Sequence, residues 1–459
     1  MFQELRDFLR VLEAAGELVR ISEELSPLYE IGAAIRYADE RGGPAVLCER
    51  VKGYDVPVVG NLLGTRRRLA IALGVAEARL KDAYWQGRQD PIRPRLVKDA
   101  PVQDVVIDRD VDILAAMPIL THHERDASPY MSSAFTVAKD PETGLRSMGL
   151  HRVQVKDQDT IGIFLATPPL SHFLTKAETR GQPLEIAIVS GAAPAAFFAS
   201  CVSAPQGIDK FDLAGGFMGR PIELVKCRTV DLEVPAYAEF VLEGEIIPGR
   251  RETEGPFGES TGYYLTYDNP VGKIKAITHR KSPIYHALMP FTIHGEESVL
   301  TDLPVEVDLL LTLQAVVPGV QQVRSPSPLL LVVQIEKRSE DDAPKVIDAL
   351  LPRPSSKLVI VVDTDVDVDD LSEVLWAVTT RAYLDRGLLL RSGLPGLIID
   401  PSTTGGEITP DISYFITRTT KMGIDATKPL AERERLAKID LPPAVKQRVY
   451  ELMARALRR

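Results

Sequence analysis

The order of helical and strand-like patterns along the 459-residue chain constrains its fold more than any other feature. Helical and strand-like segments alternate through the first ~100 residues, which is typical of an α/β unit. From there to about residue 290, short strand-like runs separated by Gly, Pro and Asp favour a barrel or sandwich, and the last third returns to alternation. The sequence therefore predicts an α+β protein with an N-terminal α/β domain (1–105), a β-rich domain (106–300), and a linker helix with a C-terminal α/β domain (301–459).

The overall charge limits the partners of the chain. A net charge of -10 and a pI near 5.4 argue against nucleic acid or an anionic membrane surface, because both call for basic patches. The first residues predict an amphipathic helix that ends at Gly16, and no apolar run approaches the ~18 residues of a membrane span. Three scattered cysteines indicate neither a disulfide framework nor a cysteine zinc site. We expect a cytoplasmic protein.

The stretch EGPFGES at 254–260 places two acids, Glu254 and Glu259, at the ends of four uncharged residues. Its glycines and Pro256 predict a turn, because proline fixes φ and glycine adopts conformations that other residues avoid. Such a turn could be a solvated surface loop, or it could carry chemistry on a rigid scaffold.

Two other clusters of possible metal ligands do not match known metal-binding motifs. The adjacent His122 and His123 lack the spacing of a helical zinc motif and are predicted to be accessory or surface residues. The acidic run at 363–370 lacks the glycine and the bidentate glutamate of a calcium loop, and it is predicted to cap the helix that follows.

Several long strings resemble the UbiD-type decarboxylases in order and spacing, over essentially the whole chain. They are EFVLEGEIIPGRRETEGPFGESTGYY at 239–264, SMGLHRVQVKD at 147–157, LVKCRTVDLEVPA at 224–236, LWAVTTR at 375–381 and TKMGIDATKPL at 420–430. The resemblance implies an N-terminal α/β domain, a central split β-barrel that holds prenylated FMN, and a C-terminal domain used in oligomerisation.

The same resemblance implies a reversible, non-oxidative decarboxylase of an aromatic, heteroaromatic or α,β-unsaturated acid. The family's glutamate-arginine-glutamate set falls on Arg152, Glu254 and Glu259. Arg152 would bind the substrate carboxylate through its planar, charged fork. Glu259 would give a proton to the carbon that CO2 leaves, and Glu254 would hold Arg152. Loss of CO2 from an sp2 carbon needs an electron acceptor, which the flavin supplies.

Cofactor contacts also carry over from the family by position. They fall on Ser147, Met148, Gly149, Leu150, His172, Ser200, Lys210 and Lys421. The family holds a divalent metal, usually Mn2+, with K+ nearby, through an asparagine, a histidine and a glutamate. Of these ligands only the histidine, His172, is present, because Ser147 and Lys210 occupy the other two positions.

Two interpretations of this departure remain open. Either the ammonium of Lys210 replaces the metal and neutralises the flavin phosphate directly, or Asp209 or Asp212 supplies the missing carboxylate and the metal stays. We favour the first, because both changed positions belong to one site.

The remaining expectations concern substrate and partners. His294 could bond a ring heteroatom of the substrate, or it could be an ordinary histidine at a strand end. The resemblance implies a separate flavin prenyltransferase as cofactor supplier, and a homodimer or homohexamer. The alternative function is a catalytically silent, UbiD-like scaffold subunit of a larger carboxylase.

Overall fold

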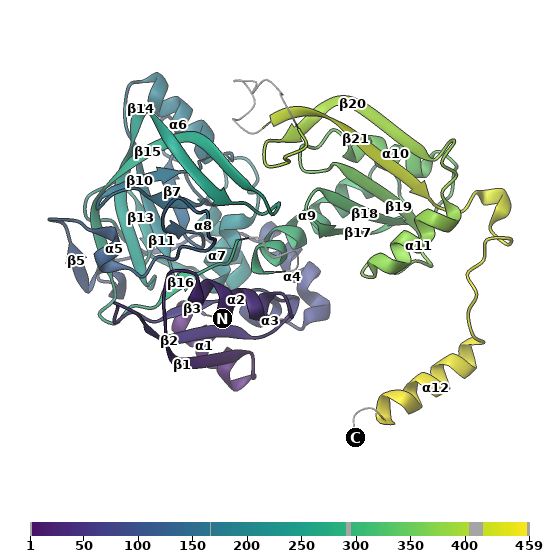
Figure 1. Cartoon of the computed structure of the whole chain (residues 1–459), viewed down its shortest axis with the longest axis horizontal. Helices are drawn as coiled ribbons and strands as arrows, with labels where there is room; N and C mark the ends of the chain where they lie inside the picture. Colours follow the sequence, from purple (N-terminus) through teal and green to yellow (C-terminus); the bar gives the residue numbers. More distant parts are fainter. Residues whose placement is uncertain (1, 166, 291–294, 404–415, 457–459) are drawn as a thin grey trace.

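The chain folds into three successive parts in a computed structural model that describes residues 2–165, 167–290, 295–403 and 416–456 (Figure 1). The first two parts share one hydrophobic core, because helices of the N-terminal part pack against helices of the central part. The C-terminal part has its own apolar clusters on the two faces of its sheet. A mixed α+β protein is thus confirmed.

The N-terminal part is a four-stranded sheet with the strand order β1-β2-β3-β16. The strands span Leu18–Leu25 (β1), Ala45–Val51 (β2), Val58–Gly60 (β3) and Tyr285–Ala287 (β16). The helices span Leu5–Ala14 (α1), Glu30–Asp39 (α2), Arg66–Ala72 (α3) and Leu80–Gln89 (α4), with a 3-10 turn at Glu77–Arg79. Because β16 pairs in parallel with β3, a segment predicted for the β-rich domain instead completes the N-terminal sheet.

The central part is built on a nine-stranded sheet with the order β6-β9-β10-β15-β14-β11-β7-β8, and β5 pairs with β15. Its strands span Val105–Ile107 (β5), Tyr130–Met131 (β6), Phe135–Lys139 (β7), Arg146–Leu150 (β8), Val153–Val155 (β9), Thr160–Ile163 (β10), Leu184–Ser190 (β11), Phe240–Gly258 (β14) and Tyr264–His279 (β15). A smaller sheet joins Arg95–Val97 (β4), Glu223–Lys226 (β12) and Glu233–Pro235 (β13). The pairing of the large sheet is an open path from β6 to β8, so a barrel is not shown.

The central part holds more helix than the single helix that the sequence predicts there. Besides the short Ile113–Ala116 (α5) and the expected Leu170–Thr179 (α6), it contains Pro194–Cys201 (α7) and Lys210–Met218 (α8). Nearly every residue of α7 and α8 is buried. A helix that is apolar on all sides shows no 3.6-residue periodicity, which is why the pattern analysis missed both.

The C-terminal part is a five-stranded sheet with the order β17-β18-β19-β21-β20. Its strands span Val320–Ser327 (β17), Leu330–Ile335 (β18), Leu358–Asp363 (β19), Leu388–Leu397 (β20) and Ile416–Ala426 (β21), and its helices span Asp342–Leu350 (α10) and Leu371–Arg381 (α11). The long helix Glu296–Gln314 (α9) connects it to the rest, and Pro443–Ala456 (α12) lies away from the body of the chain (Figure 1). None of the helices in the described residues is long and apolar enough to cross a membrane.

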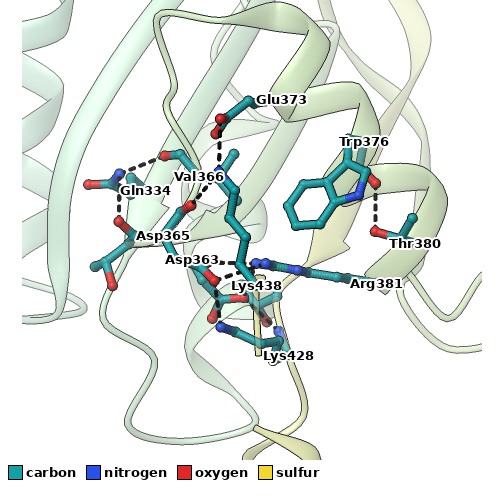
Figure 2. Close-up of polar contacts among 12 residues, drawn as sticks. Gln334, Asp363, Asp365, Val366, Glu373, Trp376, Thr380, Arg381, Lys428 and Lys438 are labelled. Carbon is teal, nitrogen blue, oxygen red and sulfur yellow. Dashed lines mark hydrogen bonds and ion pairs between the residues drawn. The ribbon is translucent and has the colours of Figure 1, made fainter. Parts of the chain in front are cut away.

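Residues of the acidic run at 363–370 contact both ends of α11. Asp370 caps the helix, accepting a hydrogen bond from the Ser372 amide at 2.8 Å, as the sequence predicts for the run as a whole. Asp363 and Asp365 instead pair with Arg381 at the last turn of α11, at 3.1 and 2.7 Å (Figure 2). These pairs, with Lys428, fix the chain that follows β21 to the end of the sheet.

Candidate active site

The stretch between the two glutamates is a bulge inside a long hairpin and not the turn that the sequence predicts. In the β14–β15 pairing, Glu254 lies opposite Tyr267 and Phe257 opposite Leu265, so two residues of β14 face one residue of β15. Gly255 has φ of 108°, and a Cβ there would lie 2.5 Å from the Leu265 carbonyl oxygen. Glycine is therefore required at this point, and the bulge re-aims the strand just before Glu259.

Arg152 joins the two glutamates from another part of the sheet, between β8 and β9. Its Nε and Nη2 donate to the two carboxylate oxygens of Glu254 at 3.1 and 2.8 Å, and its Nη1 donates to Glu259. Arg152 is 8% exposed and Glu254 is fully buried. Burial alone lowers the pKa of Arg152, but the charges of Glu259 and Glu254 raise it overall, so the guanidinium keeps its proton.

Two aromatic rings lie close to the guanidinium of this ion pair. The guanidinium carbon of Arg152 lies 3.9 Å from the ring centre of Phe164 and 4.7 Å from that of Phe257. The ring of Tyr130 lies 4.5 Å from that of Phe257. Burial, and then the nearby charge of Glu254, raise the pKa of the Tyr130 hydroxyl, so Tyr130 stays neutral.

Each glutamate has a second support. Asn269 on β15 donates to Glu254 Oε2 at 2.7 Å, so Glu254 is bonded from two directions inside the protein. Glu259 Oε1 accepts from the Ser260 amide at 2.9 Å, and its side chain is half-buried at the hairpin end. Glu254 is thus held on all sides by the protein, whereas the side chain of Glu259 remains partly exposed.

A loop from the start of the central part holds the hairpin end. Asp126 accepts hydrogen bonds from the amides of Gly258 at 3.0 Å and His123 at 2.8 Å. Burial would raise the pKa of Asp126, but its hydrogen bonds to His123 and Gly258 lower it overall, so it stays ionised. The histidine pair therefore belongs to a loop that positions Glu259 through Gly258.

A cavity opens beside Arg152 and Glu259 and holds about 740 Å³ of space, part of it open to solvent. Its lining includes Leu150, His151, Phe257 and Leu288, and Ile399 reaches it from the C-terminal part. The His151 Nδ1 atom is buried without a hydrogen-bond partner. A side chain at Gly149 would collide with the His151 ring, its Cβ 2.5 Å from Cε1. The space thus combines apolar walls with an unpartnered polar atom, as ligand pockets do.

Lys210 supplies an unusual buried cation near this cavity. Its ammonium donates to the Ser200 carbonyl at 2.9 Å and makes no ion pair with an acid in the described part of the chain. Burial lowers its pKa to about 8, and its charge contributes to lowering the pKa of His151. A buried ammonium without a carboxylate is costly, which indicates a place for an anion.

The other predicted cofactor contacts are distributed over the structure. On β8, Ser147 is buried and Met148 is part of the hydrophobic core. His172 is exposed on α6, and Lys421 lies on β21, donating to the Arg353 carbonyl at 2.5 Å. His294 lies outside the described residues. Within those residues, no three His, Cys, Asp or Glu side chains gather where they could hold a metal ion.

Pattern analysis missed the residues that support the central ion pair. Phe164, Tyr130, Asn269 and Asp126 come from four separate segments and carry no shared motif. Only Asp126 offered a signal, because it lies three residues after the noted histidine pair in THHERD. Their roles depend on strand pairing between distant segments, which a single sequence does not specify.

Two buried histidines predict an acid-sensitive fold. Burial lowers the pKa of His122 to about 4 and that of His151 to about 3, whereas an unfolded histidine titrates near 6.5. Stability is therefore fully present above pH 6.5 and is lost as pH falls toward 4, by roughly 1.4 kcal/mol per pH unit for each histidine. Urea unfolding at several pH values should show this slope. The exposed His172→Gln variant should keep the slope and His122→Gln should reduce it; an unchanged slope in His122→Gln would contradict the assignment.

Comparison with known proteins shows similarity along nearly the whole chain. Family models match in order: the 3-octaprenyl-4-hydroxybenzoate carboxy-lyase (UbiD) N-terminal domain at 9–83, its Rift-related domain at 95–292 and its C-terminal domain at 298–426. The chain belongs to the UbiD family. It is accordingly an enzyme of the carboxy-lyase type, and the predicted membership is confirmed.

Individual members of the UbiD family agree with this assignment. A phenolic acid decarboxylase of Sedimentibacter hydroxybenzoicus is 35% identical over 94% of this chain and 92% of its own. The structure of the UbiD-class enzyme HmfF from Pelotomaculum thermopropionicum with FMN has a TM-score of 0.88 at 39% identity, covering 96% of this chain and 98% of that one. An evolved dimeric form of HmfF with prFMN has a TM-score of 0.85 at 38% identity, covering 97% and 98%.

Proposed function

We propose that this protein is a prenylated-FMN-dependent, reversible, non-oxidative decarboxylase of an aromatic, heteroaromatic or α,β-unsaturated acid. The observation that carries the proposal is the guanidinium of Arg152 held between Glu254 and Glu259 at the edge of a cavity. The cavity suits a flavin because it has apolar walls, an unpartnered His151 nitrogen and a buried ammonium nearby. UbiD-class neighbours hold FMN and prFMN, which supports the same choice of cofactor.

When bound, the prenylated flavin supplies the electron acceptor that loss of CO2 requires. Arg152 uses three of its N–H groups on the two glutamates, out of the five that a guanidinium carries. The remaining donors can hold the substrate carboxylate next to Glu259. Glu254, fixed by Asn269, keeps Arg152 in place.

Glu259 is the proton carrier in this proposal. It lies at the cavity and is less buried than Glu254, so its carboxylate can reach a bound molecule. Protonated Glu259 would give its proton to the substrate carbon that CO2 leaves, and in carboxylation the ionised carboxylate would take the proton back.

The proposal is tested with protein produced together with a flavin prenyltransferase. Cofactor-loaded protein is mixed with a panel of aromatic and conjugated acids, and both CO2 release and ring- or vinyl-proton exchange with deuterium are followed. We expect at least one acid to react. Bound flavin with no reaction across the panel would favour the scaffold alternative, and absence of any flavin absorbance would contradict cofactor binding.

We further propose that Lys210 takes the place of a metal at the flavin phosphate. Asp209 is one candidate for a replacement metal ligand, but its carboxylate already has other partners. It accepts a hydrogen bond from the Phe211 amide at 2.9 Å, which caps α8, and it pairs with Arg146 at 2.6 Å. A protonated lysine cannot ligate a cation, but it can neutralise a phosphate as a point charge.

Flavin binding should therefore survive metal removal. The dissociation constant for FMN, measured by fluorescence quenching, is expected to change less than about twofold on adding EDTA, whereas Lys210→Gln should weaken binding roughly 10- to 100-fold. Lys226→Gln, which alters an exposed lysine, is the matched control. Loss of binding in EDTA with recovery on adding Mn2+ would show that a metal holds the phosphate.

The finer architecture follows from the same proposal. We propose that the nine-stranded sheet serves as the split β-barrel that holds the flavin, and that the C-terminal part, 301–459, serves in subunit assembly. The domain limits 1–105 and 106–300 remain predictions, with β16 crossing between the two. Size-exclusion chromatography with light scattering would show a dimer or hexamer if assembly occurs.

A further inference from the structure

A second space between α9 and the C-terminal sheet adjoins the cavity beside Arg152 and Glu259, and we call it the extension. This extension holds about 960 Å³ and shares Glu297 and Ile399 with the lining of the first cavity. Ser260 and Thr261, the two residues after Glu259, form part of its wall. Thr261 donates to the Ile399 carbonyl at 2.7 Å, so central and C-terminal parts meet at this wall. The two spaces therefore adjoin at Glu297 and Ile399, beside the site formed by Arg152 and Glu259.

The described residues of the wall of the extension are rich in hydroxyl groups and include no lysine or arginine. The hydroxyls come from α9, from the C-terminal part and from the segment that follows Glu259, and include Thr261, Ser298, Thr301, Ser327 and Ser355. Neither lysine nor arginine is among the described lining residues. Hydroxyls both donate and accept hydrogen bonds, so such a wall suits uncharged polar groups.

The only charged side chains of this described lining are acids. Glu297 lines both cavities, and Asp302 lies five residues farther along α9. Asp302 makes no ion pair in the described part of the chain, and burial, with the charge of Glu306, raises its pKa to about 7. Arg66 and Arg324 line a neighbouring space together with Asp302, where they bond Glu306 at 2.8 and 3.0 Å. The described lining thus offers no lysine or arginine to an anionic group.

We propose that the end of the substrate remote from its reacting carboxylate occupies this extension, so that the enzyme takes monocarboxylates with an uncharged, hydrogen-bonding far end and rejects their dicarboxylate or phosphorylated counterparts. The inference rests on the proposed function, because it assumes that the reacting carboxylate is held at Arg152. A second carboxylate about 6 Å from Glu297 or Asp302 would lie beside acids and without a cation in a partly desolvated space, and we expect a loss of about 10- to 100-fold in affinity.

The test uses matched pairs of acids on benzoic, cinnamic and furoic scaffolds. Within each pair the far position carries either a hydroxymethyl group or a carboxylate. Binding is measured by perturbation of the absorbance of bound flavin, which needs no turnover, and deuterium exchange gives kcat/KM. In the natural protein the hydroxymethyl acid should be preferred at least about 10-fold by both measures. Asp302→Arg should reverse the preference, and Glu297→Gln should narrow it.

Controls separate this inference from the proposed function. Asp348→Asn removes one negative charge from the exposed surface of α10 and should leave the preference unchanged. No flavin binding, or no response to any acid, would overturn the proposed function. The inference alone would be overturned if the protein binds flavin and the hydroxymethyl acid but binds the dicarboxylate equally well. It would also be overturned if neither variant changes the ratio of the two affinities. Circular dichroism checks that Asp302→Arg and Glu297→Gln are folded. If one of these variants does not fold, the preference measured with the other tests the inference.

Discussion

Replacing Arg152 with methionine is expected to destabilise the fold by about 3–5 kcal/mol and to abolish measurable decarboxylation. The structural cost arises because Glu254 is fully buried and would lose its cation, leaving only the bond from Asn269. The catalytic cost arises because no other cation borders the active-site cavity in the described residues. Thermal melting of the flavin-free protein and CO2 release by the loaded enzyme report the two effects separately.

A double replacement distinguishes the two costs. In the variant Arg152→Met with Glu254→Gln, both buried charges are gone, so most of the lost stability should return, as is usual when a buried pair is removed together. Activity should not return, because nothing then holds the substrate carboxylate. Arg152→Lys keeps a charge but not the two-pronged geometry, and should lie between the extremes in stability. Recovery of activity in the double variant would contradict the role of Arg152.

The sequence predicts which residues form the candidate site better than it predicts the geometry that positions them. The sequence segments that resemble the UbiD family identify Arg152, Glu254 and Glu259, and the structure brings all three side chains together. The turn predicted between the glutamates was wrong, because Gly255 and Pro256 carry the same local preferences in a bulge as in a turn. Only the pairing with β15, set by distant residues, distinguishes the two.

Long-range pairing also explains the other differences between sequence and structure. Strand β16 resembles its β-rich neighbours in composition, yet it completes the N-terminal sheet through pairing with β3. The helices α7 and α8 were missed since burial on all sides removes their periodicity. The buried state of Lys210, on which the proposed phosphate contact depends, is likewise a product of packing and not of its neighbours in sequence.

Replacing Glu259 with glutamine is expected to lower decarboxylation about 10²- to 10⁴-fold while leaving the fold and flavin binding intact. Glutamine has the same shape, but it cannot give or take a proton, and general acid catalysis typically contributes a factor of this size. The fold should tolerate the change because Glu254 still pairs with Arg152 through two hydrogen bonds and the Glu259 side chain is only partly buried. Deuterium exchange, which needs the same proton transfer, should fall in parallel with CO2 release.

Two further variants make this expectation specific. Glu252→Gln changes the same residue type on the hairpin strand β14. Glu252 pairs with Arg250 at a distance of 2.6 Å and is not part of the cavity lining, so the rate should stay within about twofold. Glu259→Asp keeps a carboxylic acid but withdraws it by one methylene, so its rate should lie between those of glutamate and glutamine. If Glu259→Gln instead exchanges deuterium at the natural rate, the proton must come from another group. Since Tyr130 is a buried, neutral hydroxyl close enough to the ion pair for the charge of Glu254 to raise its pKa, Tyr130→Phe would then be expected to lose exchange.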